Sequence, residues 1–317
     1  MALRVAIQMD PLETVDIDAD TTFALAETAQ ARGAQIWTYG PQDLTYAEGR
    51  VTARARPSTV QRIKDTPAVF GSAEVLDLRN DVDVVLMRQD PPFDMAYITA
   101  CHILELLAPD TLVLNEPSHV RGWPEKLFPL LHADLIPPTL ISRDTAAIGS
   151  FRARHQDIIL KPLYGNGGAG VFRVKPEDGN YTSLLEMFLE RTREPVIAQA
   201  FLPAVSEGDK RVILIDGEPV GAINRIPKSG ETRSNLHVGG TAAPVDLTEA
   251  DKAICAAIGP ALKAGGQVLV GIDVIGGRLT EVNNTSPTGV QELKRFNGVD
   301  APALFWDAVQ SRLAATE

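Results

Sequence analysis

The stretch from Asp157 to Val174, DIILKPLYGNGGAGVFRV, decides which nucleotide-binding fold the chain can adopt. Its apolar start predicts a strand over Ile158–Leu160, and Val171–Val174 predicts a second strand after a glycine-rich turn. A Walker loop ends in Gly-Lys-Ser/Thr, and both it and a dinucleotide fingerprint lead from a strand into a helix. Neither pattern is present, so the sequence predicts a glycine-rich hairpin.

Two lysines near this hairpin suggest a phosphate-binding site. The bare backbone N–H groups of a glycine turn can lie against phosphate oxygens. Lys161 lies near the end of the first strand, and Lys126 belongs to a helix predicted around Glu125–His132, so each would place a cation beside a bound phosphate. Glycine-rich hairpins are common, and both lysines have the alternative of being solvated surface residues. A phosphate site is therefore a hypothesis at this point.

A second hairpin carries oxygen ligands. The apolar run Val268–Val274 contains Asp273, and the turn Gly276-Gly277 leads into the strand of GRLTEVNNTSPTG (277–289), which carries Glu281 and Asn283. Side chains two apart in a strand share a face, and a tight turn makes the two strands antiparallel neighbours. Three oxygen donors with no lysine among them would repel one another unless a cation such as Mg²⁺ lay between them. The alternative is a solvated sheet face.

The N-terminal part alternates strands and helices. Strands are predicted over Leu3–Met9, Ala34–Tyr39, Val82–Met87 and Thr111–Leu114, and helices over Thr21–Arg32 and Met95–Leu107. Such βαβ grammar predicts an open parallel sheet, whose ligand crevice lies at the carboxyl ends of the strands. Met9-Asp-Pro11 and Arg88–Asp94 follow two of these strands and offer both charge signs to a zwitterionic ligand. Ordinary Asp-Pro turn chemistry is the alternative.

The remaining pattern is mixed and carries basic residues. It predicts strands over Leu140–Ser142 and Val196–Phe201, helices over Asp144–His155 and Thr248–Ala264, and a hairpin turning at Asp216-Gly217. Lys210, Arg211, Arg225 and Arg233 would stabilise charge developing on a transferring phosphoryl group. Arg233 lies in the glycine-rich loop 226–240, which is either disordered or a lid that excludes water.

Composition excludes several classes of protein. The 317 residues suit two or three lobes, and 44% hydrophobic with 22% charged residues is typical of a globular chain. A net charge of −11 argues against nucleic acid as a partner, because phosphate binding needs clustered basic residues. We expect Cys101 and Cys255 to be buried, reduced thiols, and we expect no signal peptide and no membrane span, hence a cytoplasmic protein.

In this order, the segments closely resemble the bacterial glutathione synthetase family of the ATP-grasp superfamily. The resemblance rests on motifs that run along nearly the whole chain: Met9-Asp-Pro11, Asp90–Asp94, Glu125–Phe128, Asp157–Pro162, Gly208–Arg211, Asp216–Pro219, Gly230–Arg233, Gly271–Asp273, Glu281–Asn283 and Thr285–Thr288. It implies an α/β protein, α+β in its C-terminal part, with the ATP-grasp fold. The implied division is an N-terminal open-sheet substrate domain (1–120), a central lid domain (121–203) and a C-terminal domain (204–317) with a flexible loop at 226–240.

The resemblance implies that the chain joins γ-glutamylcysteine to glycine through an acyl phosphate, releasing ADP and phosphate. ATP would be the co-substrate, Mg²⁺ the cofactor with Mn²⁺ as an alternative, and the assembly a homotetramer. ATP would be bound by Lys126, Lys161, Gly165, Gly167, Gly168, Gln199, Leu202 and Asp209. The metal would be held by Asp273, Glu281 and Asn283. Arg211, Arg225 and Arg233 would orient the acyl phosphate, and the dipeptide would meet Asp10, Arg88, Asp90, Ser286, Pro287 and Thr288.

Three positions depart from the family pattern, and two other functions stay open. Gln89 and Glu116 stand where lysine is common, and Tyr164 replaces an acid before the glycine turn. Gln89 is expected to weaken carboxylate binding. The open alternatives are an ATP-grasp ligase for another acid and amine, and a non-catalytic nucleotide-binding regulator.

Overall fold

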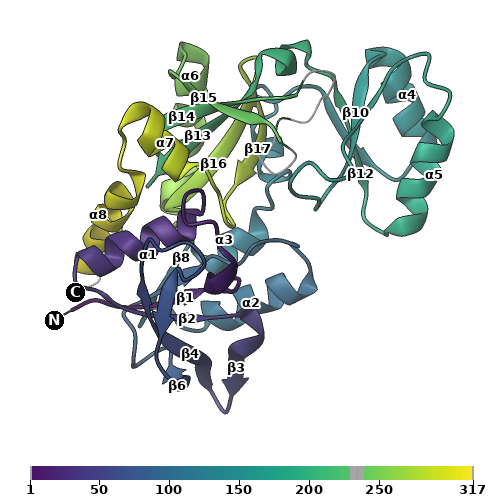
Figure 1. Ribbon diagram of the computed structural model, residues 1–317. Helices are drawn as coiled ribbons and strands as arrows, with labels where there is room; N and C mark the ends of the chain where they lie inside the picture. Colours follow the sequence, from purple (N-terminus) through teal and green to yellow (C-terminus); the bar gives the residue numbers. More distant parts are fainter. Residues whose placement is uncertain (1, 229–233, 235–238, 316–317) are drawn as a thin grey trace.

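The protein was analysed as a computed structural model that describes residues 2–228, 234 and 239–315 (Figure 1). In this part of the chain the strands form three sheets. The first contains β1 (Arg4–Gln8), β2 (Gln35–Tyr39), β3 (Leu44–Ala47), β4 (Arg50–Val60), β5 (Ala68–Phe70), β6 (Glu74–Asp77), β7 (Val84–Met87) and β8 (Leu112–Leu114). The second contains β9 (Thr139–Ser142), β10 (Ile158–Pro162), β11 (Phe172–Val174) and β12 (Val196–Ala200). The third contains β13 (Asp209–Ile215), β14 (Glu218–Ile226), β15 (Thr241–Val245), β16 (Leu269–Ile275) and β17 (Arg278–Asn283).

The first sheet has a parallel part and an antiparallel extension. Strands β2, β1, β7 and β8 pair in parallel, which confirms the predicted open sheet. Strand β4 pairs antiparallel with β2 and also carries β3, β5 and β6. The extension was not predicted, although Val51, Ala53 and Ala55 alternate with outward-facing residues as a half-buried strand requires.

Helices cover both faces of the parallel strands. Val5 and Ile7 of β1 belong to the core under α1 (Thr21–Ala31), whereas Ala6 belongs to the core under α2 (Met95–Glu105). The alternation follows from the two-residue period of a strand. As predicted, Asp20 caps α1, because its carboxylate accepts a hydrogen bond from the Phe23 N–H at 2.6 Å. The short α3 (Pro117–Gly122) follows β8.

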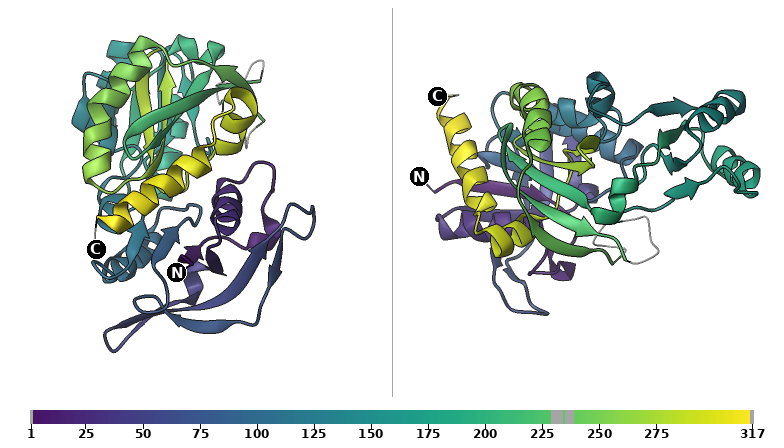
Figure 2. Two further views of the ribbon diagram at one scale, coloured as in Figure 1. Left: turned by 90° about the vertical axis from the view of Figure 1, so that its left-hand side faces the viewer. Right: turned by 90° about the horizontal axis from the view of Figure 1, so that it is seen from above.

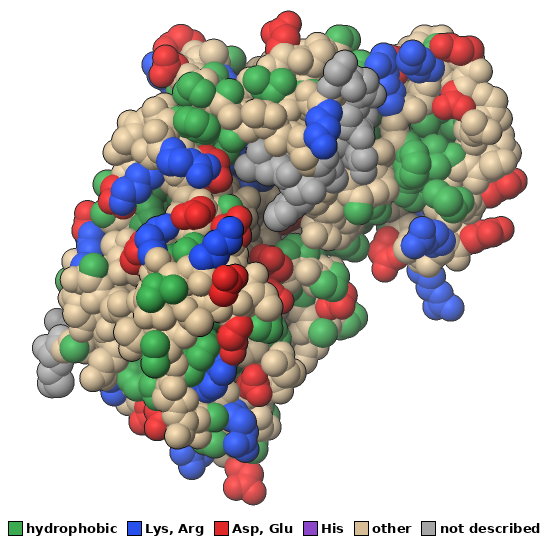
Figure 3. Space-filling view, in the orientation of Figure 1, with side chains coloured by type: hydrophobic (Ala, Val, Ile, Leu, Met, Phe, Trp, Pro, Cys, Tyr) green, Lys and Arg blue, Asp and Glu red, His purple; other side chains and the backbone are tan. Residues whose placement is uncertain are grey.

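The second sheet has a core of its own. Helices α4 (Thr145–His155) and α5 (Tyr181–Arg191) pack on it through Ile148 and Leu185. This lobe projects from the rest of the molecule (Figure 2), and the space-filling view shows a recess beneath it (Figure 3). Acidic and basic side chains are mixed over the face in Figure 3.

The third sheet shares its core with the first. Val212 and Leu214 of β13 face α6 (Glu249–Ala264), while Ile213 and Ile215 lie in the core with Val5 and Ile7 of β1. Helices α7 (Val290–Asn297) and α8 (Ala301–Ala314) cover this joint core beside α1 (Figure 1). The Trp306 indole N–H donates to the Leu25 carbonyl at 2.8 Å, so α8 is tied to α1.

A buried amide network joins the first and third sheets. Asn115, directly after β8, donates its side-chain N–H groups to the carbonyls of Leu269 at 2.7 Å and Asn284 at 2.8 Å. The Asn284 side chain donates to Gln267 Oε1 at 3.1 Å. This network fixes the end of β17, directly after Asn283.

The two predicted tight turns are present, whereas one predicted helix is shorter than expected. Both tight hairpins are confirmed: Asp216-Gly217 and Gly276-Gly277 have positive φ at both positions, as a type I′ turn requires. The predicted helix over Glu125–His132 is wrong for its first part, because a turn precedes a 3₁₀ helix that covers only Phe128–His132. Pro129 lacks the N–H that a regular helix would use there.

Candidate active site

A pocket lies between the second and third sheets and contains the residues predicted to bind ATP. The glycine-rich turn between β10 and β11 covers one side of it, and Gly167 and Gly168 have φ of +62° and +79°, which favours glycine. The pocket is lined by Lys126, Lys161, Gly165, Gly167, Gly168, Gln199, Leu202 and Asp209. Asp273 and Glu281 complete the polar part of its wall.

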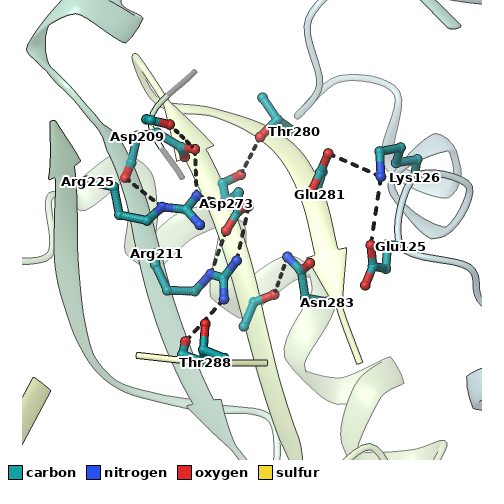
Figure 4. Close-up of polar contacts among 12 residues, drawn as sticks. Glu125, Lys126, Asp209, Arg211, Arg225, Asp273, Thr280, Glu281, Asn283 and Thr288 are labelled. Atoms are coloured by element: carbon teal, nitrogen blue, oxygen red, sulfur yellow. Dashed lines mark hydrogen bonds and ion pairs between the residues drawn. The ribbon is translucent and has the colours of Figure 1, made fainter. Parts of the chain in front are cut away.

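Two buried lysines, Lys126 and Lys161, converge on Glu281, and Figure 4 shows the first of them. Lys126 Nζ lies 3.4 Å and Lys161 Nζ 3.5 Å from the same oxygen, Glu281 Oε1. Burial acts to lower the pKa of both lysines. At Lys126 the charges of Glu281 and Glu125 outweigh burial, so its pKa is raised. At Lys161 burial outweighs the charge of Glu281, so its pKa is lowered. Both are less than a tenth exposed, so the surface-lysine alternative is wrong for both.

Apolar side chains line the rest of the pocket and were not predicted. Gln199 of β12 donates its amide N–H to Thr139 Oγ1 of β9 at 2.8 Å, which holds the Gln199 side chain in place. The unpredicted apolar residues include Ile159, Val171, Val205 and Ile275. The alternation of β10, in which Ile159 and Lys161 share a face, was the available signal.

Two arginines and two aspartates form a buried cluster on β13, β14 and β16 (Figure 4). Arg211 donates to Asp273 from Nε at 2.6 Å, and Arg225 lies 2.9 Å from Asp273 and 2.5 Å from Asp209. Burial acts to raise the pKa of Asp273, but both guanidinium groups outweigh it and hold this pKa well below its usual range. Burial raises the pKa of Asp209 to about 6 against the opposing charge of Arg225.

The three predicted metal ligands lie on the adjacent strands β16 and β17, and cations of the protein already neutralise both carboxylates. Asp273 and Glu281 are direct partners in the β16–β17 register. Asn283 donates its amide N–H to the Gly271 carbonyl at 3.2 Å, which leaves the amide oxygen as its acceptor. In the described part of the chain, no cluster of three or more His, Cys, Asp and Glu side chains forms a metal site. The predicted set fits Mg²⁺ with two carboxylates and one amide oxygen, which are ligands that this ion accepts.

A second, larger cavity adjoins the first and contains all the residues predicted to bind the dipeptide: Asp10, Arg88, Asp90, Ser286, Pro287 and Thr288. It also contains Arg211, Arg225 and Asn283, and it shares Asn166, Gly167 and Glu281 with the nucleotide pocket. We call it the cleft below. The end of β17 thus brings the two cavities together.

Arg88 is a buried cation of the cleft, like Arg211 and Arg225. Its guanidinium donates to Thr22 Oγ1 at 3.1 Å and to the Pro287 carbonyl at 3.1 Å. Burial lowers the pKa of Arg88, and none of the described carboxylates forms an ion pair with it. The charges of Asp20 and Asp90 act on it from farther away, so the guanidinium could still bind an anion in the cleft.

Arg233 lies outside the described residues, as does most of the loop 226–240. Ser234, which is described, donates its hydroxyl to Asp209 Oδ2 at 2.8 Å. The predicted lid therefore stays a prediction.

The three departures from the family pattern have distinct surroundings. Gln89 is buried, accepts a hydrogen bond from Gln8 and is not among the residues that line the cleft, and its expected effect on carboxylate binding stays a prediction. Glu116 caps α3 by accepting from the N–H groups of Ser118 and His119. Tyr164 stacks on Phe93 with ring centroids 5.9 Å apart, so it joins the glycine turn to the loop that carries Arg88.

Residues that the sequence did not single out also line the cleft. Glu125 is largely buried, and its carboxylate accepts a hydrogen bond from Thr285 Oγ1 at 3.1 Å. Burial raises its pKa. The sequence predicted a helix here, and the observed turn before Phe128 is what brings the Glu125 carboxylate to the cleft.

The fold and the paired cavities define an ATP-grasp ligase. The chain matches the family model "Prokaryotic glutathione synthetase, ATP-grasp domain" over residues 125–298 and "Prokaryotic glutathione synthetase, N-terminal domain" over residues 3–121. It belongs to the prokaryotic glutathione synthetase family. The activity of the family is the ATP-dependent formation of glutathione, with glycine as a substrate, and the chain is an enzyme of this class.

Individual relatives agree over the full length. The chain is 53% identical to a glutathione synthetase of Mesorhizobium japonicum, with 98% of this chain and 99% of that protein covered. It is 54% identical to a glutathione synthetase of Brucella melitensis, with 98% and 100% covered. Among solved structures, a D-cycloserine synthetase superposes with a TM-score of 0.69 at 17% identity, covering 98% of this chain and 99% of that one, which supports the fold alone.

Within the described residues, no helix combines the length and the apolar character that crossing a bilayer requires.

Proposed function

We propose that the two cavities divide the reaction between them. Lys126, Lys161 and the glycine turn hold the phosphates of ATP, Gln199 to Leu202 face the adenine, and Asp209 accepts from the ribose hydroxyls. The support is the convergence of two buried ammonium groups at 3.4 and 3.5 Å from one carboxylate oxygen, because phosphates are the anions that can share them.

Asp273, Glu281 and Asn283 would hold Mg²⁺, with Mn²⁺ as an alternative ion. When bound, the ion neutralises phosphate charge and polarises the phosphoryl group. The residues of the chain do the remaining work: Lys126 and Lys161 orient the phosphates, and Arg211 and Arg225 keep Asp273 charged.

γ-Glutamylcysteine binds in the cleft between Asp10, Arg88 and Asp90 on one side and Ser286, Pro287 and Thr288 on the other. Its cysteinyl carboxylate attacks the γ-phosphorus of ATP, and the bond to ADP breaks. Arg211 reaches this point from β13 and also donates to the Thr288 carbonyl at 3.1 Å, so it links the arginine cluster to the substrate loop. The amine of glycine then attacks the acyl carbon, and phosphate leaves.

One observation carries this assignment: Glu281, Asn166 and Gly167 line both cavities. A phosphoryl donor in the first and a carboxylate in the second would meet at this shared wall, as in-line transfer requires.

The three sheets support the division into domains 1–120, 121–203 and 204–317, because each contains one sheet. The homotetramer is proposed from family resemblance alone.

A coupled assay for ADP tests the proposal. ADP release should need ATP, γ-glutamylcysteine and glycine together, and should fall to background when either amino-acid substrate is omitted. Release that ignores γ-glutamylcysteine, or that needs a different acid, would overturn it. Hydroxylamine in place of glycine should trap the acyl phosphate as a hydroxamate.

A further inference from the structure

Glu125 has a carboxylate charge that the protein neutralises poorly. Its side chain is 17% exposed and lines the cleft. Lys126 Nζ is 3.8 Å away, which is farther than the 2.6 Å from this nitrogen to the Gly165 carbonyl and the 3.4 Å to Glu281. The ammonium of Lys126 is thus shared among three acceptors, and Glu125 is the most distant of them. The remaining close partner of Glu125 is the hydroxyl of Thr285, which carries no charge.

Backbone contacts fix the place of this carboxylate. The Glu125 carbonyl accepts from the Val282 N–H at 2.9 Å, which anchors the turn against β17. Thr285 follows β17 directly, and the Arg88 guanidinium lies 3.5 Å from its carbonyl. Glu125 therefore lies on a rigid wall, next to the lysine proposed to hold phosphate (Figure 4).

A partly exposed carboxylate in a cleft, hydrogen-bonded to a neutral hydroxyl, is a site for a small cation. Two substrates bring ammonium groups: the γ-glutamyl end of the dipeptide and glycine. The γ-glutamyl ammonium is several bonds from the reacting carboxylate, and Asp10 and Asp90 are two further carboxylates of the cleft that could bind it. The glycine nitrogen must reach the acyl carbon beside the γ-phosphate, which is where Lys126 lies.

We propose that Glu125, supported by Thr285, binds the ammonium group of the incoming glycine and so holds its nitrogen beside the acyl carbon. The ammonium loses one proton to solvent before the neutral amine attacks, and a second proton leaves with phosphate as the amide forms. The inference rests on the proposed placement of the γ-phosphate beside Lys126. Glycine recognition would then come from the turn before Phe128 rather than from the loops of the first sheet.

The test compares two acceptors in Glu125→Gln, which keeps the size of the side chain and its bond to Thr285 but removes the charge. The KM for glycine should rise about tenfold or more, as expected for the loss of a charged hydrogen bond. The KM values for ATP and γ-glutamylcysteine should stay within about twofold. Hydroxylamine is uncharged near neutral pH, so hydroxamate formation by the variant should stay close to that of the wild type.

Asp16→Asn is the matched control, because Asp16 is an exposed carboxylate of the same cleft and its loss changes the charge equally. It should leave the KM for glycine unchanged. A glycine KM within about twofold of wild type in Glu125→Gln would overturn the proposal, as would an equal loss with both acceptors. A rise in the KM for ATP instead would show that Glu125 serves Lys126.

Two further measurements keep the test decisive. Thermal unfolding of each variant checks the fold, and Glu125→Asp, which keeps the charge but withdraws it, should raise the glycine KM while sparing hydroxylamine. Hydroxamate formation by the wild type tests the acyl phosphate by itself, so failure of the proposed function is distinguishable from failure of the Glu125 assignment.

Discussion

Asp273 and Glu281 are direct partners across β16 and β17, yet different cations neutralise them: arginines at Asp273 and lysines at Glu281. Burial acts to raise the pKa of both carboxylates, but the neighbouring cations act in the opposite direction more strongly. The net result is that both pKa values are lowered. Both groups are therefore charged at neutral pH. Phosphates and a divalent ion that bind here would replace existing ion pairs between these carboxylates and the lysines and arginines.

Glu281→Gln should raise the Mg²⁺ concentration for half-maximal activity by at least about tenfold, because even the outer partners of metal ligands are worth this much. Turnover at saturating ATP, measured over a Mg²⁺ titration, checks this. Glu249→Gln removes a carboxylate that is 89% exposed on α6 and should leave the titration unchanged. The same Mg²⁺ requirement in wild type and Glu281→Gln would refute the ligand role.

Arg225→Met should lower the free energy of unfolding by about 3–5 kcal/mol, since it leaves two buried aspartates with fewer cations. Urea denaturation at pH 8 measures the loss. Adding Asp209→Asn to this variant should restore part of it, because the second buried charge is then gone.

Arg50→Met is the matched control, because Arg50 pairs with Asp77 at the surface and its side chain is 68% exposed. Its cost should be about 0–1 kcal/mol. An equal loss in the single and the double variant would contradict the role of Asp209.

We expect the KM for ATP to depend on pH because of the raised pKa of Asp209. Its pKa is raised from 3.8 to about 6 by burial, so its charge is present at pH 8 and is lost as the pH falls through 6. A neutral carboxyl is a weaker acceptor for ribose hydroxyls, so the KM for ATP should rise as the pH falls from 8 to 5. In Asp209→Asn the KM should be high and nearly flat over this range. A wild-type KM that stays constant would remove Asp209 from nucleotide binding.

The Tyr164–Phe93 stack should couple the two cavities, because it joins the glycine turn to the loop that carries Arg88. An aromatic pair is worth about 0.5–1.5 kcal/mol, which corresponds to roughly two- to tenfold in affinity. Calorimetry of γ-glutamylcysteine binding, with and without a non-hydrolysable ATP analogue, measures the coupling. Tyr164→Ala should lose it and Tyr164→Phe should keep it. Equal coupling in Tyr164→Ala and wild type would show that the stack is incidental.

The regular elements of the chain could be predicted because their signals are local. Asp20 before α1, the positive-φ turns at Asp216-Gly217 and Gly276-Gly277, and the apolar run of β16 each act within a few residues. The antiparallel extension around β4 was missed because its pairing joins segments whose turns lack a strong signature. The turn at Glu125 was read as a helix because its apolar residues have a helical spacing, which Pro129 interrupts.

The site was harder to derive than the fold. The facing positions of Asp273 and Glu281 follow from the hairpin alone, but the lysines that neutralise Glu281 come from two other segments. No spacing rule in the sequence brings Lys126 and Lys161 together. The sequence argument that no lysine lies among Asp273, Glu281 and Asn283 was wrong, because both lysines contact Glu281. Asn284, whose role the sequence left unexplained, belongs to the amide network with Gln267 and Asn115.

The joint core of the first and third sheets has a consequence for how substrates enter. Because Trp306 and α8 tie α1 to β13, the cleft residues that come from the first and third sheets belong to one packed unit. Asn166 and Gly167, which line both cavities, belong instead to the second sheet, which has a separate core around Ile148 and Leu185. A movement of the lobe that carries α4 and α5 would therefore change the walls of both cavities at once, and we expect entry to the two cavities to be coupled.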